Sequence, residues 1–360
     1  MKKKVVVGMS GGVDSSAAAL LLKEAGYEVI GATMLFWRDQ KSLKAAEDKC
    51  GGEDAAEDAA AVCSVLDIPH HVFDFRDLFR ERVVSYFTEE YLKGRTPNPC
   101  VVCNRYVKWE ALMLSCDSLG ADFCATGHYA RIDRLANGRW TVMNSVTARK
   151  DQTYALFNLT QDQLSRTLMP VGSYDKDQVR EMARKAGLPV ADKAESMEIC
   201  FIPDNDYAAF LDRYSGGKVP GPGRFVWKDG QDLGPHKGIT HYTIGQRKGL
   251  GIAMGRPVFV KEIRPETDTV VLGDHEDVFT TELTCSRLNM MGLASLPEGE
   301  EVSCIGKVRY AHGGQECRIF RTGEDTVRAV FDSRVRAVTP GQAAVFYDRE
   351  GHVLLGGFIS

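Results

Sequence analysis

Short apolar runs alternate with helical segments through the first half of the chain. The apolar runs predict strands at 5–8, 28–36, 70–73 and 123–126. Apolar positions at helical spacing predict helices at 15–25, 53–66, 77–91 and 105–119, with two more at 161–168 and 176–186. Strands that alternate with helices are typical of an α/β fold built on a parallel sheet.

The pattern changes after about Asn205. Glycine- and proline-rich stretches are followed by short strands at turn-spaced intervals, which predict successive hairpins and a small closed barrel at the C-terminus. We therefore expect three parts: an α/β domain at 1–204, a small β-rich central domain at 205–278, and a C-terminal β-barrel at 279–360.

The first predicted strand runs directly into a glycine-serine-aspartate turn and then into a helix. The turn has the composition of a phosphate cradle, because glycines permit a tight backbone and the helix N-terminus attracts anions. It contains neither GxxxxGK[ST] nor GxGxxG. A glycine-rich surface turn is the alternative interpretation. In a parallel sheet the turn, Met34 and the Gly127-His128 pair would meet at one edge. The turn comprises Gly8, Met9, Ser10, Gly11, Gly12, Val13, Asp14 and Ser15.

Composition narrows the class of protein. The chain has 360 residues, of which 44% are hydrophobic and 26% charged, and no apolar run reaches the length of a membrane span. The start MKKKVVVGMSGG does not look like a signal peptide, so we expect a cytoplasmic protein. The net charge of −4 argues against indiscriminate nucleic-acid binding. Residues 236–264 are nevertheless basic, which suits either phosphate contact or a solvated loop.

Ten cysteines in a cytoplasmic chain favour catalytic, redox or metal-binding roles over disulfides. Most of them lie in apolar contexts and are expected to be packing residues, as are Trp109 and the aromatic residues of FDFRDLF. The cysteines expected to pack are Cys63, Cys116, Cys124, Cys304 and Cys317. His70 and His71 are expected to be packing or surface residues, and His312 is expected to lie in a turn.

Two segments place cysteines where chemistry is plausible. TPNPCVVCN presents Cys100 and Cys103 just ahead of a predicted helix, whose dipole would favour the reactive thiolate. ICFIPD carries Cys200 far away in sequence. Because a persulfide needs a second thiol to resolve it, a pair such as Cys103 and Cys200 would suit sulfur transfer.

The motifs together resemble a known family. SGGVDSS resembles the pyrophosphate loop of the ATP pyrophosphatases. Its combination with GRTPNPCVVCN, ATGHYAR, KDQTYAL, ICFI and HYTIGQRKGLGI resembles the bacterial tRNA-uridine 2-sulfurtransferases, or 2-thiouridylases, from end to end. The resemblance implies an adenine nucleotide α-hydrolase-like catalytic domain and ATP-dependent thiolation of the wobble uridine of tRNA.

The resemblance also implies roles for individual residues. ATP would bind at residues 8–15 with Met34 and Gly127 at the adenosine, and Asp14 would help to hold Mg²⁺. Cys200 would carry a persulfide, and Cys103 would be the nucleophile that releases sulfide or resolves the intermediate, leaving a disulfide. Asn98, Pro99 and Cys100 would face the target base. The positions that match tRNA contacts are His128, Lys150, Asp151, Gln152, Arg309, Tyr310 and Gln342.

One departure from the family pattern leaves the sulfur chemistry open. Family members carry aspartate where this chain has Cys100, so Cys100, Cys103 and Cys200 could instead hold a [4Fe–4S] cluster. A plain redox dithiol is a third possibility, and zinc is disfavoured because no second ligand pair has finger spacing. The expected partners are tRNA and a sulfur-relay protein or cysteine desulfurase, with the chain acting as a monomer. An ATP-dependent amidating enzyme and a non-catalytic RNA-binding protein are the rival functions.

Overall fold

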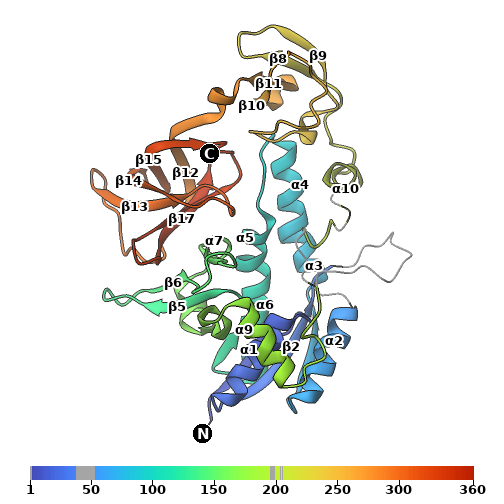
Figure 1. Cartoon of the computed structure of the whole chain (residues 1–360), viewed down its shortest axis with the longest axis vertical. Coiled ribbons are helices and arrows are strands. Elements are labelled where there is room, and N and C mark those ends of the chain that lie inside the picture. Colours follow the sequence, from blue (N-terminus) through green and yellow to red (C-terminus); the bar gives the residue numbers. More distant parts are fainter. Residues whose placement is uncertain (1, 38–52, 195–198, 203, 205) are drawn as a thin grey trace.

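The computed structural model describes residues 2–37, 53–194, 199–202, 204 and 206–360. It contains a parallel sheet with helices, a small four-stranded sheet and a closed barrel (Figure 1). The predicted fold class is confirmed. No helix in the described ranges is long and apolar enough to cross a membrane.

The parallel sheet has five strands in the order β3-β2-β1-β4-β7. Successive side chains of β1 point to opposite faces, so Val5 and Val7 join one hydrophobic cluster and Val6 joins another. All three are fully buried, as expected for a parallel sheet covered on both faces. The strands are β1 (Lys4–Gly8), β2 (Glu28–Leu35), β3 (His70–Asp74), β4 (Phe123–Ala125) and β7 (Thr167–Leu168).

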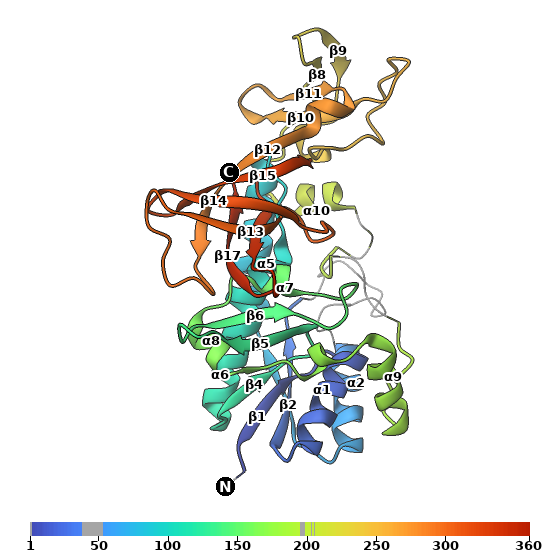
Figure 2. The same ribbon diagram turned by 60° about the vertical axis from the view of Figure 1, so that its left-hand side comes forward.

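Helices cover both faces of this sheet (Figure 2). Val5 and Val7 pack with α1 (Val13–Glu24), α2 (Glu53–Val65) and α9 (Lys176–Lys185). The opposite face packs against α6 (Trp109–Leu119) and a long helix that reaches the far end of the molecule. That long helix consists of α3 (Arg76–Phe79), the π-helical turn η1 (Arg80–Val84) and α4 (Ser85–Leu92).

Two predicted helices were wrong at one end. The helix expected at 161–168 stops at Ser165 (α8, Gln161–Ser165), because Thr167 turns to pair with β4 and its hydroxyl accepts from Trp109 Nε1 at 2.8 Å. The helix expected at 105–119 begins earlier, at α5 (Pro99–Cys103), and continues through the π-helical turn η2 (Asn104–Lys108) into α6.

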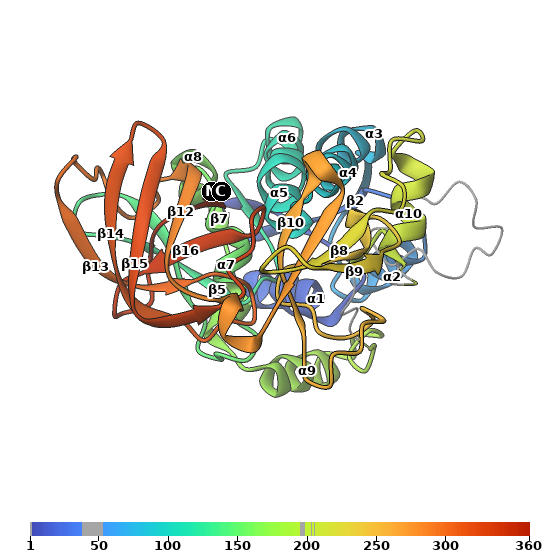
Figure 3. The ribbon, with the colours of Figure 1, turned by 90° about the horizontal axis from the view of Figure 1, so that it is seen from above.

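The second half of the chain is built from β-strands. A four-stranded sheet has the order β10-β11-β8-β9, and six strands close a barrel in the order β12-β15-β14-β13-β16-β17 (Figure 3). The small sheet contains β8 (Arg224–Trp227), β9 (Asp232–Pro235), β10 (Phe259–Arg264) and β11 (Thr269–Gly273). The barrel contains β12 (Phe279–Asn289), β13 (Glu301–Lys307), β14 (Gln315–Gly323), β15 (Thr326–Arg336), β16 (Ala343–Tyr347) and β17 (Val353–Ile359).

A hairpin joins the catalytic part to the barrel. It consists of β5 (Ala130–Arg134) and β6 (Trp140–Asn144), and it lies directly beneath the barrel in Figure 2. Arg139 Nε donates to Met291 O at 2.8 Å, and Thr141 Oγ1 donates to Val353 O at 2.7 Å. The remaining elements are α7 (Thr153–Leu156), α10 (Tyr207–Tyr214) and the 3₁₀ turns η3 (Pro170–Ser173), η4 (Ile239–His241), η5 (Pro265–Thr267) and η6 (His275–Val278).

Candidate active site

A cavity of about 390 Å³ opens at the carboxyl ends of β1, β2 and β4. This edge of a parallel sheet is where ligands bind in such folds. The cavity brings most of the predicted site residues together, as expected from their positions after the strands. Those residues are Gly8, Met9, Ser10, Asp14, Ser15, Met34, Pro99, Cys100, Cys103, Gly127, His128, Gln152 and Cys200.

The glycine-rich turn has the geometry of an anion site. Gly12 stands just before helix α1 and has no side chain that could cap the first N–H groups of the helix. Ser15 Oγ accepts from Ser10 N at 3.1 Å, which holds the turn closed. A Cβ on Gly127 would lie 2.5 Å from Ser15 N, so only glycine lets the chain after β4 approach the start of α1. Gly11, Gly12 and Val13 belong to the turn but do not line the cavity.

Asp14 is held by two residues that the sequence analysis missed. Lys176 Nζ lies 2.8 Å from Asp14 Oδ1 and 2.9 Å from Oδ2, and the Tyr129 hydroxyl donates to Oδ1 at 2.7 Å. Lys176 is the first residue of α9, more than 160 positions after the turn, so no local motif points to it. Among the described residues that line the cavity, Asp14 is the one carboxylate. A single carboxylate fits Mg²⁺, which takes its other ligands from nucleotide phosphates and water.

The two cysteines of the CxxC motif lie on the helix that starts at Pro99. Asn98 Oδ1 caps this helix by accepting from Cys100 N at 3.1 Å, and proline occupies the first helical position. Cys100 and Cys103 are three residues apart and share a face. The Asn-Pro pair is a helix-start signal that could have predicted this boundary.

A π-helical turn follows directly after Cys103. Lys108 follows Cys103 by five positions, a spacing that would place them on different faces of a regular α-helix but on similar faces across a π turn. Lys108 accordingly lines the cavity with both cysteines and with His128. The sequence analysis missed Lys108, because an α-helical projection turns it away from the cysteines.

Burial opposes the thiolate form that a helix N-terminus is expected to favour at this site. Burial raises the pKa of Cys103 to about 12, and it raises the pKa of Cys100, although the Cys100 side chain is exposed toward the cavity. The positive charge of Lys108 lowers the pKa of both thiols, against the effect of burial. Desolvation therefore outweighs the charge of Lys108 at both thiols.

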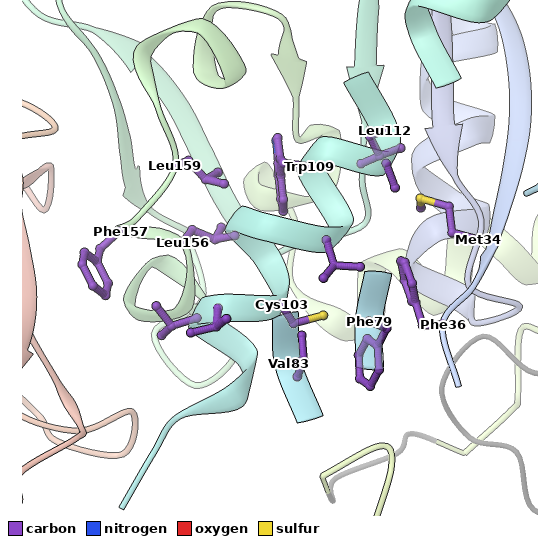
Figure 4. Packing of buried hydrophobic residues seen from close by; sticks show 14 of the residues in the cluster. Met34, Phe36, Phe79, Val83, Cys103, Trp109, Leu112, Leu156, Phe157 and Leu159 are labelled. Carbon is purple, nitrogen blue, oxygen red and sulfur yellow. The ribbon is translucent and has the colours of Figure 1, made fainter. Parts of the chain in front are cut away.

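Cys200 reaches the same cavity because its neighbour anchors the segment. Phe201 is almost fully buried, with ring centroids 5.6 Å from Phe79, 5.4 Å from Phe87 and 5.2 Å from Phe210. Figure 4 shows the Cys103 sulfur pointing toward the side of Phe79 and Phe36, which is the side of this aromatic cluster. Residues 195–198, just before the ICFIPD motif, and residue 203 within it lie outside the described residues.

His128 and Gln152 form part of the cavity wall. Burial and the charge of Lys108 lower the pKa of His128 to about 3, so the ring is neutral at physiological pH. Its Nδ1 lies 2.9 Å from Thr126 Oγ1, and its ring centroid is 5.3 Å from that of Trp109. Gln152 Oε1 accepts from Tyr129 N at 2.8 Å.

The other predicted tRNA-contacting residues lie outside this cavity. Arg309 and Gln342 line a second cavity of about 230 Å³ between the barrel, the loop at Thr243 and the chain at Thr96. Tyr310 is exposed on the barrel, and Lys150 is half-buried. The Asp151 carboxylate accepts from Ser145 N at 2.8 Å and from the Thr153 hydroxyl at 2.5 Å, as in a turn.

The cysteines predicted to pack are buried as expected, whereas His71 is exposed and His70 and His312 are half-buried. The cysteines of this group are Cys63, Cys116, Cys124, Cys304 and Cys317, and Trp109 is fully buried as well. All nine cysteines in the described part of the chain carry free thiols. Three of the nine line the cavity, and three thiols are the donor set of a [4Fe–4S] cluster with one open iron, so the residues fit that group.

Comparison with known proteins identifies the family. Three family models match in succession: a tRNA methyl transferase HUP domain at residues 3–204, a tRNA methyl transferase PRC-barrel domain at 208–274, and an aminomethyltransferase β-barrel domain at 280–359. The tRNA-specific 2-thiouridylase MnmA of Lachnoclostridium phytofermentans is 56% identical over 99% of this chain and 98% of its own length. The chain belongs to the tRNA-specific 2-thiouridylase family.

Other members of the thiouridylase family match over the same extent. Those of Clostridium perfringens and Acetivibrio thermocellus are 49% and 50% identical, each over 99% of this chain. The family resemblance drawn from the motifs is thus confirmed. The descriptions of the family models mention methyl transfer, whereas the full-length relatives are named 2-thiouridylases. A cavity lined by three thiols agrees with the names of the full-length relatives.

Proposed function

We propose that this protein thiolates the 2-position of the wobble uridine of tRNA, using ATP to activate the uracil oxygen. The observation that carries the proposal is that the glycine-rich turn and Cys100, Cys103 and Cys200 line one cavity. An enzyme that only adenylylates or amidates has no use for these thiols.

In the first step the uracil 2-oxo oxygen attacks the α-phosphorus of ATP. A P–O bond forms to uracil, the bond to the β-phosphate breaks, and pyrophosphate leaves. The N–H groups at the start of α1 would stabilise the negative charge on the phosphates. Mg²⁺ bound near Asp14 would neutralise part of that charge.

In the second step a persulfide on Cys200 supplies the sulfur. Its terminal sulfur attacks C2, the C2–O bond breaks, and AMP leaves with the oxygen. The Cys103 thiolate then attacks Cys200 Sγ, and the electron pair of the broken S–S bond forms the thiocarbonyl. A Cys103–Cys200 disulfide remains, which an external dithiol reduces. A sulfur-relay protein or a cysteine desulfurase would load the persulfide.

The same three thiols are the basis of a second sulfur route. A [4Fe–4S] cluster held by Cys100, Cys103 and Cys200 would bind sulfide at its open iron and deliver it without a change of oxidation state. The two sulfur routes differ in their need for Cys100, because the relay needs only Cys103 and Cys200 whereas the cluster needs all three cysteines. We propose the relay, with the chain acting as a cytoplasmic monomer divided at 204/205 and 278/279.

Anaerobic single-turnover thiolation of unmodified tRNA tests the proposal, with ATP and either a persulfide donor, which the relay needs, or sulfide, which the cluster would use. Mercury-gel retardation detects the thiolated tRNA. With the persulfide donor and without iron, wild type and Cys100→Ser should both thiolate, whereas Cys200→Ser should release pyrophosphate but form no thiouridine. Loss of activity in Cys100→Ser together with loss of iron would favour the cluster. Absence of thiolation by the wild type under all these conditions would overturn the proposed function.

A further inference from the structure

The segment just before the CxxC helix is clamped by the barrel. We call residues 94–97 the strap; it runs from the end of α4 to α5 (Figure 1). Thr96 N donates to Pro340 O at 2.9 Å. In return, Gln342 Nε2 donates to Thr96 O at 2.9 Å and lies 3.4 Å from Pro97 O. The barrel thus binds Thr96 N, Thr96 O and Pro97 O. Pro97 lies two residues before Pro99, where α5 begins.

The approach of the barrel to the strap is close. Gly341 has φ +90°, and a Cβ there would lie 3.0 Å from Thr96 N and 3.1 Å from Thr96 O. A side chain at this position would therefore push the strap away, and the left-handed conformation would also be strained.

The central sheet reaches the other end of the strap. A Cβ on Gly94 would lie 2.7 Å from Pro265, in the turn that joins β10 and β11. The loop at Gly245, which precedes β10, is joined to the barrel, since Arg336 Nη2 donates to Gly245 O at 3.0 Å. Within the barrel part, Arg309 Nη1 donates to Arg336 O at 2.7 Å. Both the turn between β10 and β11 and the barrel therefore contact the strap.

We propose that Gln342 is a positioning residue that couples the barrel to the Cys100–Cys103 helix. This inference rests on the proposed function and deepens it. The strap leads into Asn98, whose side chain caps the helix, and Pro97 and Pro99 limit the backbone freedom between clamp and cap. A displaced strap would therefore move Cys100 and Cys103 relative to Cys200. Family resemblance assigns Gln342 to tRNA contact, whereas its amide donors are used here within the chain.

Three readouts on Gln342→Met distinguish these roles: hydrogen exchange of residues 95–103, the Kd for tRNA, and the rate of single-turnover thiolation. Met has a similar length but no donor. If the Gln342 hydrogen bonds hold the strap, Gln342→Met should show faster exchange at Thr96 than wild type, with a Kd for tRNA within about twofold. Thiolation should be slower by roughly 10- to 100-fold, because small misplacements of reacting groups reduce rates by about that much. Gln342→Lys keeps a donor for the carbonyls and should restore both exchange protection and rate.

Gly341→Ala perturbs the same clamp without removing any polar group, and it should reproduce the pattern of Gln342→Met. Gly26→Ala is the matched control, because Gly26 has φ +88° with open space around its Cβ position. Gly26→Ala should leave exchange at 95–103 and the rate unchanged. Should Gly341→Ala fail to fold, Gln342→Met decides.

Unchanged exchange at Thr96 in Gln342→Met, or a loss of tRNA affinity that accounts for the whole loss of rate, would overturn the positioning role. If the wild type does not thiolate tRNA, the proposed function fails, but hydrogen exchange still decides whether the clamp holds the strap.

Discussion

Lys176 Nζ lies 2.8 and 2.9 Å from the two carboxylate oxygens of Asp14, so a cation from α9 faces the first turn of α1. The pair stands beside the glycine-rich turn, where the phosphates of ATP are proposed to bind. The turn lacks the lysine of a GxxxxGK[ST] loop, and Lys176 brings a lysine to the same place from a distant part of the chain.

Replacing Lys176 by Met should weaken ATP binding by roughly tenfold, because one charge-assisted contact to phosphate is lost and Asp14 then repels the nucleotide. Isothermal titration with a non-hydrolysable ATP analogue measures the effect. Lys185→Met removes a lysine at the exposed end of the same helix and should leave the affinity unchanged. Equal affinity in wild type and Lys176→Met would show that Lys176 serves only to hold Asp14.

Lys108 should act on the sulfur chemistry and not on adenylylation. Its charge lowers the pKa of Cys103 against the effect of burial, so Lys108→Met should reduce the thiolate fraction at that site. We expect single-turnover thiolation to slow by about tenfold, which corresponds to about 1.4 kcal/mol of lost anion stabilisation. Pyrophosphate release with tRNA, which reports adenylylation, should stay within twofold of wild type. A parallel fall of pyrophosphate release and thiolation would place Lys108 at the nucleotide instead.

The contact between the β5–β6 hairpin and the barrel should depend on pH. His352 is buried, with Nδ1 2.8 Å from Asp348 Oδ2 and Nε2 3.0 Å from Asp133 Oδ2, while Glu350 lies 3.7 Å away. Burial opposes protonation, but the hydrogen bonds and charges of Asp348 and Asp133 outweigh it and raise the pKa of His352.

A raised pKa in the folded state means that protonated His352 stabilises the fold. This contribution is fully present below the unfolded value of about 6.5 and is lost as the pH rises through the folded pKa. His352→Gln should therefore lower the melting temperature more at pH 6 than at pH 9. His71→Gln, at an exposed histidine, is the control. An equal decrease at both pH values would contradict the role of the charged ring.

The sequence predicted the parts of the site that follow from local pattern. Strand-turn-helix order identified the glycine-rich turn, and the parallel sheet implied that the turn, Met34 and Gly127 would share an edge. The sequence could not predict Lys176, because its contact with Asp14 depends on how α9 packs on α1. It could not place Lys108, because a π turn changes which residues share a face.

The reactivity of the cysteines also needed the structure. A CxxC motif at a helix start suggests a low thiol pKa, whereas Cys103 is buried among apolar side chains and its pKa is raised. The resemblance assigned Gln342 to tRNA, and only the coordinates reveal its hydrogen bonds to the strap. In each case the missing information was a contact between segments far apart in the sequence.

The fate of the uracil 2-oxo oxygen tests the central claim most directly. A tRNA labelled with ¹⁸O at the 2-position of the wobble uridine would be incubated with the enzyme, ATP and a sulfur donor, and the products analysed by mass spectrometry. Activation of the oxygen by adenylylation predicts one ¹⁸O in AMP for each thiouridine formed. Thiouridine accompanied by unlabelled AMP, with the ¹⁸O in water, would contradict the account.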